Sequence, residues 1–323
     1  MVDPIPDGLI EAIRSNRCVL FAGSGLSRGL IKRDGEEKEQ SLPTWGDLLG
    51  VLIQRAKLLG RIDENEALKL FNAVIEGKFL FVAESIKSIL GTYEFENALE
   101  EIFRNPCLES TSRHELITRI PFVAAITTNY DKLIEGAYAK RDGGKIPPIY
   151  TFKNVPDIIS ALYKGKFFIL KAHGDIDQKE TIILSERNYR DIIYREPGYR
   201  AALNTIFITK TILFLGAGLV DKDVALVLES VSETFRNSGS IHYAFVPWSD
   251  ATDAEVRHWR DYFGINLIRY TATKGHPEVD TFLHNLYGER IFKGSLESSG
   301  AGSTLDEGED EGGRSWELKS SLF

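Results

Sequence analysis

Two glycine clusters each follow a short apolar run, a pattern typical of turns that bind phosphate. The first, GSGLS from Gly23, follows the run Cys18–Ala22, and the second, GAG from Gly216, follows Ile212–Leu215. Glycine lets the backbone approach a pyrophosphate, whose oxygens accept hydrogen bonds from the N–H groups of the turn. The first cluster departs from the fingerprint G-x-G-x-x-G, so a plain strand-to-helix turn explains it equally well by itself. Two such turns in one sheet favour a ligand lying across its carboxyl edge.

Polar side chains suited to acid–base chemistry follow two further apolar runs. The segment TTNYD, with Asn129 and Asp131, comes after VAAI, and the segment KAHGD, with His173, comes after FFIL. Singly, Asn and Asp at such places also suit a helix cap, and a histidine before glycine also suits a turn. Together they predict an amide, a carboxylate and an imidazole at the sheet edge that carries both glycine turns. That convergence predicts a catalytic site.

The elements that position these residues alternate between short apolar runs and amphipathic stretches. The candidate strands are Cys18–Ala22, Val123–Thr127, Phe167–Lys171, Ile212–Leu215, His242–Val246 and Asn266–Arg269. The candidate helices are Asp7–Asn16, Asp131–Ala139, Pro156–Tyr163, Ser185–Tyr194, Asp223–Arg236, Asp253–Tyr262 and Glu278–Ile291, with a capping box at Thr252-x-x-Glu255. This alternation predicts an α/β fold with a doubly wound, parallel, Rossmann-like sheet.

Residues from about Trp45 to Arg119 show a different pattern, with apolar residues at helical spacing and no convincing strand. A capping box at Ser112-x-x-Glu115 is expected to open the last helix of this stretch. We interpret it as a helical insertion in a domain spanning residues 1–293. It contains no motif with a recognisable chemical role, and a lid over the ligand edge is the simplest interpretation.

The last thirty residues, 294–323, are rich in glycine, serine and acidic side chains. They hold seven acidic and two basic residues, a composition typical of a flexible tail. The tail ends in apolar residues that include Trp316 and Phe323. A short docking motif and a frayed end are both consistent with that pattern.

Composition excludes several other classes of protein. The chain has 323 residues but only two cysteines, so a four-cysteine zinc ribbon is impossible, and no His/Cys spacing suits a metal site. The net charge is −8, and most of it falls in the tail, so no broad basic field attracts nucleic acid. Neither a signal peptide, a membrane-spanning run nor a G-x-S-x-G elbow is present. We therefore expect a cytoplasmic protein without a metal, a membrane or a nucleic acid as its direct partner.

The four motifs FAGSGLS, TTNYD, AHGD and FLGAG, in this order on these strands, resemble those of the sirtuin family. The resemblance covers roughly Asn16 to Arg269. It implies that NAD is bound, with Asn129 at the nicotinamide ribose, Asp131 at the carboxamide and His173 as the general base. The cofactor-binding residues that it implies are Ala22, Gly23, Ser24, Gly25, Ser27, Thr128, Gly216 and Gly218.

The chain also departs from the sirtuin deacylases. It lacks their zinc ribbon, and Leu42-Pro-Thr-Trp45 stands where they carry Pro-Asp-Phe-Arg. The segment Ile183–Tyr189 is similar to the zinc-lacking prokaryotic branch, many of whose members consume NAD in anti-phage defence. Membership of that branch implies a homo-oligomer with a separately encoded sensor, such as an ATPase.

The leading hypothesis is therefore an NAD hydrolase that uses water in place of an acyl-lysine. Cleavage of the nicotinamide–ribose bond builds oxocarbenium character, and histidine, with an ordinary pKa of about 6.5, suits the role of base. The products are nicotinamide and ADP-ribose, or a cyclised form. An NAD-dependent protein deacylase and a non-catalytic module that binds NAD or ADP-ribose are the alternatives.

Overall fold

A parallel β-sheet forms the centre of the molecule in the computed structural model. The structure describes residues 2–27, 42–104, 110–217, 219, 228 and 241–299, without the side chains of residues 193 and 289–299. Within these residues the strands are β1 (Cys18–Ala22), β2 (Ala125–Thr127), β3 (Ile149–Tyr150), β4 (Ile169–Lys171), β5 (Thr211–Leu215), β6 (His242–Pro247) and β7 (Ile265–Tyr270). They pair in parallel in the order β3-β4-β2-β1-β5-β6-β7.

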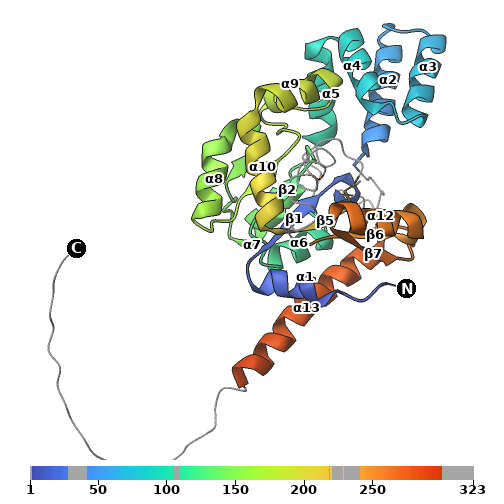
Figure 1. The fold of residues 1–323 in the computed structure, drawn as a ribbon. Helices are drawn as coiled ribbons and strands as arrows, with labels where there is room; N and C mark the ends of the chain where they lie inside the picture. The colour runs from blue at the N-terminus through green and yellow to red at the C-terminus, as the bar shows by residue number, and fades with distance from the viewer. Residues whose placement is uncertain are drawn as a thin grey trace, which may run out of the picture.

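Side chains of each central strand alternate between two apolar layers, as the period of a β-strand requires. In β1, Val19 and Phe21 join one layer, whereas Leu20 joins the other. The first layer is covered by α8 (Val155–Tyr163), α9 (Glu186–Arg195), α10 (Pro197–Thr209) and α12 (Asp253–Phe263). The second is covered by α1 (Asp7–Arg14), α6 (Ser112–Arg119), α7 (Leu133–Arg141) and α13 (Pro277–Ser299). Because both faces are covered, the strands are buried and read as continuous apolar runs (Figure 1).

The predicted doubly wound parallel sheet is confirmed, with three differences of detail. Strand β3 and helix α10 were not predicted, and α13 continues to Ser299 rather than ending near Ile291. The helix expected over residues 223–236 lies outside the described part of the chain, except for Leu228. Among the described residues, no helix is both long enough and apolar enough to cross a membrane.

Four helices between β1 and β2 form a group with its own apolar core (Figure 1). They are α2 (Trp45–Leu58), α3 (Glu64–Ile75), α4 (Phe79–Leu90) and α5 (Thr92–Phe103), and we call this group the helical insertion. Thr44 and Asp47 cap the start of α2 reciprocally. Helix α6, at the end of the stretch expected to be an insertion, packs instead on α7 and α13 and so covers the sheet.

The capping box predicted at Ser112 and Glu115 is wrong by one residue. Thr111 is the residue that caps α6, and its hydroxyl lies 2.9 Å from Nδ1 of His114, which also accepts from the Thr111 N–H at 3.3 Å. A histidine ring nitrogen here takes the place of the usual carboxylate. The box at Thr252 and Glu255 is confirmed, with the Thr252 N–H donating to Glu255 at 2.8 Å.

Chain direction places the two glycine turns next to each other. From β1 the chain runs to β2, then to the edge strand β3 and back to β4 between them, and it then crosses to β5 on the other side of β1. The order therefore reverses between β1 and β5. Open α/β sheets bind ligands in the crevice at such a reversal, outside the carboxyl ends of the strands.

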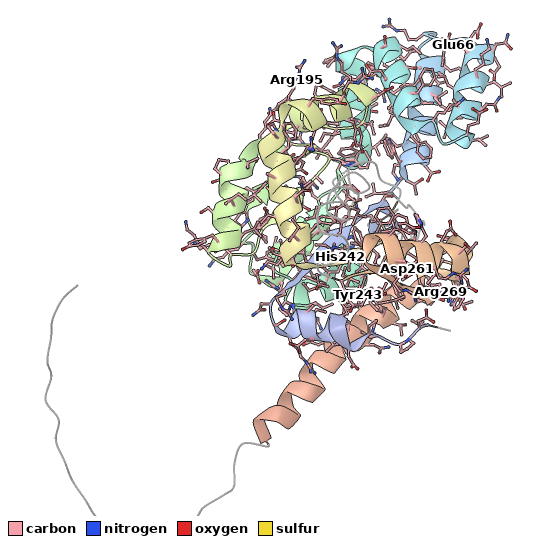
Figure 2. The ribbon with its side chains drawn as sticks, in the orientation of Figure 1. Glu66, Arg195, His242, Tyr243, Asp261 and Arg269 are labelled. Atoms are coloured by element: carbon pink, nitrogen blue, oxygen red, sulfur yellow. The ribbon has the colours of Figure 1, made fainter. Side chains whose placement is uncertain are left out.

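Acid is expected to destabilise the fold through the buried histidine of β6, His242 (Figure 2). Its Nδ1 accepts a hydrogen bond from the Ile212 N–H at 3.2 Å, and burial lowers its pKa to about 4. Between about pH 6.5 and pH 4 the unfolded chain binds a proton that the folded chain does not, so stability falls as the pH is lowered through that range. The loss reaches roughly 3 kcal/mol.

Urea denaturation between pH 4 and pH 7 tests this expectation, with His242→Gln as the comparison variant. The amide oxygen of glutamine accepts the Ile212 N–H without titrating, so the variant should lose less stability on acidification. Burial lowers the pKa of His114 in the same direction, so some acid sensitivity should remain. Equal slopes for the two proteins would contradict the assignment to His242.

Candidate active site

A cavity of about 360 Å³ lies at the carboxyl edge of the sheet, where β1, β2 and β4 end. It is bounded by the turn after β1 and by the segments after β2 and β4. The helical insertion closes its other side with Trp45 and Phe79. The residues that line it and that the sequence predicted as site residues are Gly23, Ser24, Ser27, Thr128, Asn129, Asp131 and His173.

Ser27, at the end of the short 3-10 helix η1 (Ser24–Ser27), joins the first two motifs. Its hydroxyl donates to Oδ2 of Asp131 at 3.0 Å and accepts from Nδ2 of Asn129 at 3.1 Å. The same Nδ2 donates to the carbonyl of Gly23 at 3.2 Å. A carbonyl only accepts, so this contact fixes which end of the amide is nitrogen. Ser27 therefore sets the orientation of both side chains that follow β2.

Oδ1 of Asn129 is buried and has no hydrogen-bond partner among the described residues. Nε1 of Trp45, across the same cavity, is also buried without a partner within the described part of the chain. Buried polar atoms are nearly always satisfied, so an orphaned acceptor and an orphaned donor in one cavity suit a polar ligand that offers a hydroxyl and an oxygen. A ribose offers both.

Asp131 carries a structural role beside its predicted one. Its Oδ1 accepts the Leu133 N–H at 3.0 Å, so the carboxylate also supports the start of α7, as a helix cap would. The buried Lys171 donates to the Asp131 carbonyl at 2.6 Å and forms an ion pair of 3.1 Å with the buried Glu135. The buried ion pair of Lys171 and Glu135 therefore supports the backbone of the turn that carries Asp131.

His173 is buried in the segment that follows β4. Its Nε2 shares a hydrogen bond of 3.0 Å with the hydroxyl of Tyr189 on α9. Gly174 follows with φ +91°, and a Cβ there would lie 2.1 Å from the Thr181 carbonyl, so only glycine fits after the histidine. His173 lines the cavity together with Gly23 and Thr128, which follow β1 and β2.

The two glycine turns pack backbone against backbone. The Gly23 N–H donates to the Leu215 carbonyl at 3.0 Å, and the Gly25 N–H donates to the Gly216 carbonyl at 2.9 Å. Gly216 has φ +61°, and a Cβ there would lie 2.1 Å from the amide nitrogen of Leu26. The predicted residues Ala22, Gly25 and Gly216 therefore build the turn behind the cavity and do not line it, whereas Gly218 lies outside the described residues.

Sequence reasoning missed the contribution of the aromatic side chains to the site. Trp45 stacks on Tyr189 with ring centroids 6.2 Å apart and lies 6.4 Å from His173. Phe79 and Phe103 come from α4 and α5. Trp45 belongs to the segment that replaces the usual sirtuin sequence, which was the available signal, whereas nothing in the sequence around Tyr189 indicated a contact with His173.

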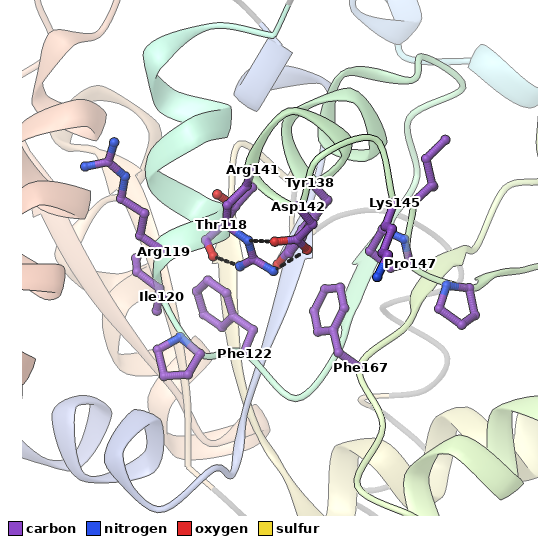
Figure 3. A pocket seen from close by; sticks show the side chains of 13 residues that line it. Thr118, Arg119, Ile120, Phe122, Tyr138, Arg141, Asp142, Lys145, Pro147 and Phe167 are labelled. Carbon is purple, nitrogen blue, oxygen red and sulfur yellow. Dashed lines mark hydrogen bonds and ion pairs between the residues drawn. The ribbon is translucent and has the colours of Figure 1, made fainter.

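A second cavity, of about 480 Å³, lies at the opposite edge of the sheet, because Phe122 and Phe167 in its wall precede β2 and β4 (Figure 3). It contains none of the predicted site residues. Arg141 in its wall donates to the Thr118 carbonyl at the end of α6 and forms an ion pair of 2.6 Å with Asp142. These contacts stabilise the ends of α6 and α7. The residues that line this cavity include no combination of groups that resembles the predicted catalytic residues.

The fold and the first cavity define a class: an α/β protein whose strand reversal and paired glycine turns are typical of dinucleotide-binding proteins. Among the described residues, no group of three or more His, Cys, Asp or Glu side chains is placed to hold a metal ion. Residues 123–268 match the SIR2-like domain family. The resemblance to sirtuins stated from the four motifs is therefore confirmed for this part of the chain.

Curated relatives extend this match. The chain is 28% identical over 192 residues to the NAD(+) hydrolase ThsA of Bacillus cereus (strain MSX-D12), covering 59% of this chain and 39% of that protein. It is 25% identical over 276 residues to the NAD(+) hydrolase ThsA of Enterococcus faecium, covering 84% and 51%. Defense-associated sirtuin 2 of Bacillus subtilis is 28% identical over 260 residues, covering 76% and 22%. The chain therefore spans about half or less of the length of these relatives.

Proposed function

We propose that this chain is an NAD glycohydrolase, which cleaves NAD with water to nicotinamide and ADP-ribose. The observation that carries the proposal is the cavity in which the unpartnered Oδ1 of Asn129 lies beside Asp131 and His173, next to the paired glycine turns. The names of two relatives, both NAD(+) hydrolases, support the same reaction.

The proposed binding mode uses each group according to its chemistry. The pyrophosphate of NAD lies at the turn after β1, where Gly23 and Ser24 line the cavity. The N–H groups of Gly23 and Gly25 already donate to backbone carbonyls, so the N–H and the hydroxyl of Ser24 are the groups of this turn that bind it. Oδ1 of Asn129 accepts a hydrogen bond from a ribose hydroxyl or from the attacking water. Asp131 accepts from the amide N–H of the nicotinamide carboxamide, with Ser27 holding its carboxylate at 3.0 Å.

The reaction then breaks the bond between the ribose C1′ and the nicotinamide nitrogen, whose electron pair leaves with the nicotinamide. The ribose gains oxocarbenium character, and the oxygen of water bonds to C1′ while its proton passes to His173. The substrate NAD supplies the leaving group and water the nucleophile, so the balance needs no further reactant.

One experiment distinguishes the proposed hydrolase from the two alternatives, an NAD-dependent deacylase and a non-catalytic binding module. The full-length protein is incubated with NAD alone and with NAD plus an acetylated peptide, and nicotinamide is measured by chromatography. Release with NAD alone supports the hydrolase. Release that depends on the peptide would indicate a deacylase, and tight binding of NAD without release, even with any activating partner added, would indicate a binding module.

We also propose that the protein acts in the bacterial cytoplasm as an anti-phage effector that depletes NAD. One relative is named a defense-associated sirtuin, which supports this role. A freely active NAD hydrolase would harm its own cell, so we propose control by self-association into a homo-oligomer and by a separately encoded sensor, such as an ATPase. We infer no direct contact with nucleic acid or membrane.

Light scattering tests the assembly. The full-length protein is expected to form a homo-oligomer through its folded part, and a chain shortened to end at Ser299, where α13 ends, should keep the same oligomeric state. The truncation removes the acidic tail and keeps the whole of α13 as described, Pro277–Ser299. A fully active monomer would contradict the proposed control by self-association. Dissociation of the truncated protein into monomers would show that the tail, and not the folded part, mediates assembly.

A further inference from the structure

The helical insertion contacts the surroundings of His173 by two separate routes that meet at Tyr189. Tyr189 lies in the first turn of α9 and is 1% exposed, and its hydroxyl is 3.0 Å from Nε2 of His173. Its ring also meets the edge of the imidazole, with centroids 5.5 Å apart. A buried hydroxyl at this distance restricts both the rotation of the imidazole and the proton position on its two nitrogens.

The first route runs through the start of α9. Glu84 of α4 accepts a hydrogen bond from the Arg187 N–H at 3.2 Å. The N–H groups of a first helical turn have no partner within the helix, and a carboxylate is favoured there by the helix dipole. Helix α4 also packs directly against α9 (Figure 1). The insertion therefore fastens the turn that carries Tyr189.

The second route runs through stacked rings. Trp45, the first residue of α2, stacks on Tyr189 with an interplanar angle of 22°. Phe79, the first residue of α4, lies 5.5 Å from Trp45 between centroids. The starts of two insertion helices are thus in contact with each other and, through Trp45, with the ring that touches His173.

We propose that Tyr189 is a positioning residue for His173, and that the helical insertion sets the position of Tyr189 through Glu84 and Trp45. The proposal rests on the proposed function, because it names how the insertion regulates the same site. A shift of the insertion, produced by assembly or by a partner, reaches the base through these contacts. Tyr189 does not line the cavity and acts on NAD only through His173.

The variant Tyr189→Phe tests the first half, since it keeps the ring and its stacking and removes only the hydroxyl. The turnover number kcat should fall by about 3- to 10-fold, the effect of one hydrogen bond, while KM for NAD stays within about twofold. A rise in KM with unchanged kcat would overturn the positioning role. Thermal unfolding checks that the variant is folded.

Nitrogen-15 NMR of the His173 imidazole gives a readout that needs no turnover. The wild-type ring should show one dominant tautomer, and the Tyr189→Phe ring should show a changed tautomer population. Unchanged ring shifts would overturn the inference even in an active enzyme. If the protein cleaves no NAD even with an activating partner added, the proposed function fails, and this measurement still decides the role of Tyr189.

A double-mutant cycle tests the second half. Glu84→Ala should lower kcat by about two- to fivefold in the wild type and hardly at all in the Tyr189→Phe background, because its effect passes through the lost hydroxyl. Glu84→Gln keeps an acceptor and should restore most of the activity. Glu64→Ala, at an insertion carboxylate paired with Lys57, is the control and should change nothing. Additive effects of Glu84→Ala and Tyr189→Phe would contradict the coupling.

Discussion

The variant His173→Ala is expected to release nicotinamide from NAD at least 100-fold more slowly than the wild type, with an unchanged fold. His173 is the imidazole that lines the cavity at the carboxyl edge of the sheet, and loss of a general base lowers a rate by about 10²- to 10⁴-fold. The alanine leaves Gly174 and its bend intact. Chromatographic measurement of nicotinamide under saturating NAD gives the rate.

His258→Ala is the matched control, because His258 is an exposed histidine of α12 outside the cavity. It should keep wild-type turnover. Asn129→Ala should act in the same direction as His173→Ala, since it removes the unpartnered Oδ1 together with the contacts to Ser27 and Gly23. Near-wild-type turnover in His173→Ala or Asn129→Ala would contradict the proposal that this cavity is the active site.

Gly216→Ala is expected to have the largest effect on stability, roughly 2–4 kcal/mol, with a loss of NAD binding. A Cβ at this position would lie 2.1 Å from the amide nitrogen of Leu26 and 2.6 Å from the carbonyl carbon of Gly25, and both are backbone atoms that cannot rotate away. The two glycine turns would have to separate. Urea denaturation measures the loss of stability, and calorimetry with ADP-ribose measures the loss of binding.

The variant Gly165→Ala separates the effect of the steric clash on stability from the effect of the positive φ angle. Gly165 has the same φ of +61° as Gly216, but a Cβ there meets nothing within 4 Å. Gly165→Ala should therefore lose only the roughly 1–2 kcal/mol of a left-handed alanine and should bind ADP-ribose normally. Equal losses in the two variants would show that the packing of the turns contributes nothing.

The strands that carry the site could be predicted because they are buried on both faces and therefore appear as apolar runs. The polar residues that follow β2 and β4 stood out against those runs, which is why the sequence indicated Asn129, Asp131 and His173, and all three line the cavity. Strand β3 was not found, because it has only two residues and both are half-buried. Helix α10 was not predicted either, although buried residues such as Leu203 and Ile206 recur in it at helical spacing.

The rest of the site depends on contacts between residues far apart in the chain. Ser27 reaches Asp131 across 104 positions, and Trp45 reaches Tyr189 from the start of a different helix. Local patterns carry no record of such pairs. The shift of the α6 cap to Thr111 has a different, local cause, because a histidine ring three residues on replaces the expected carboxylate.

A crystal structure of full-length His173→Ala with intact NAD tests the central claim most directly, since that variant should bind the substrate without consuming it. We expect the pyrophosphate at the turn of Gly23 and Ser24, the nicotinamide ribose within hydrogen-bond distance of Oδ1 of Asn129, and the carboxamide at Asp131. NAD bound in the cavity beside Tyr138 at the opposite edge, or no NAD at saturating concentration, would contradict the account.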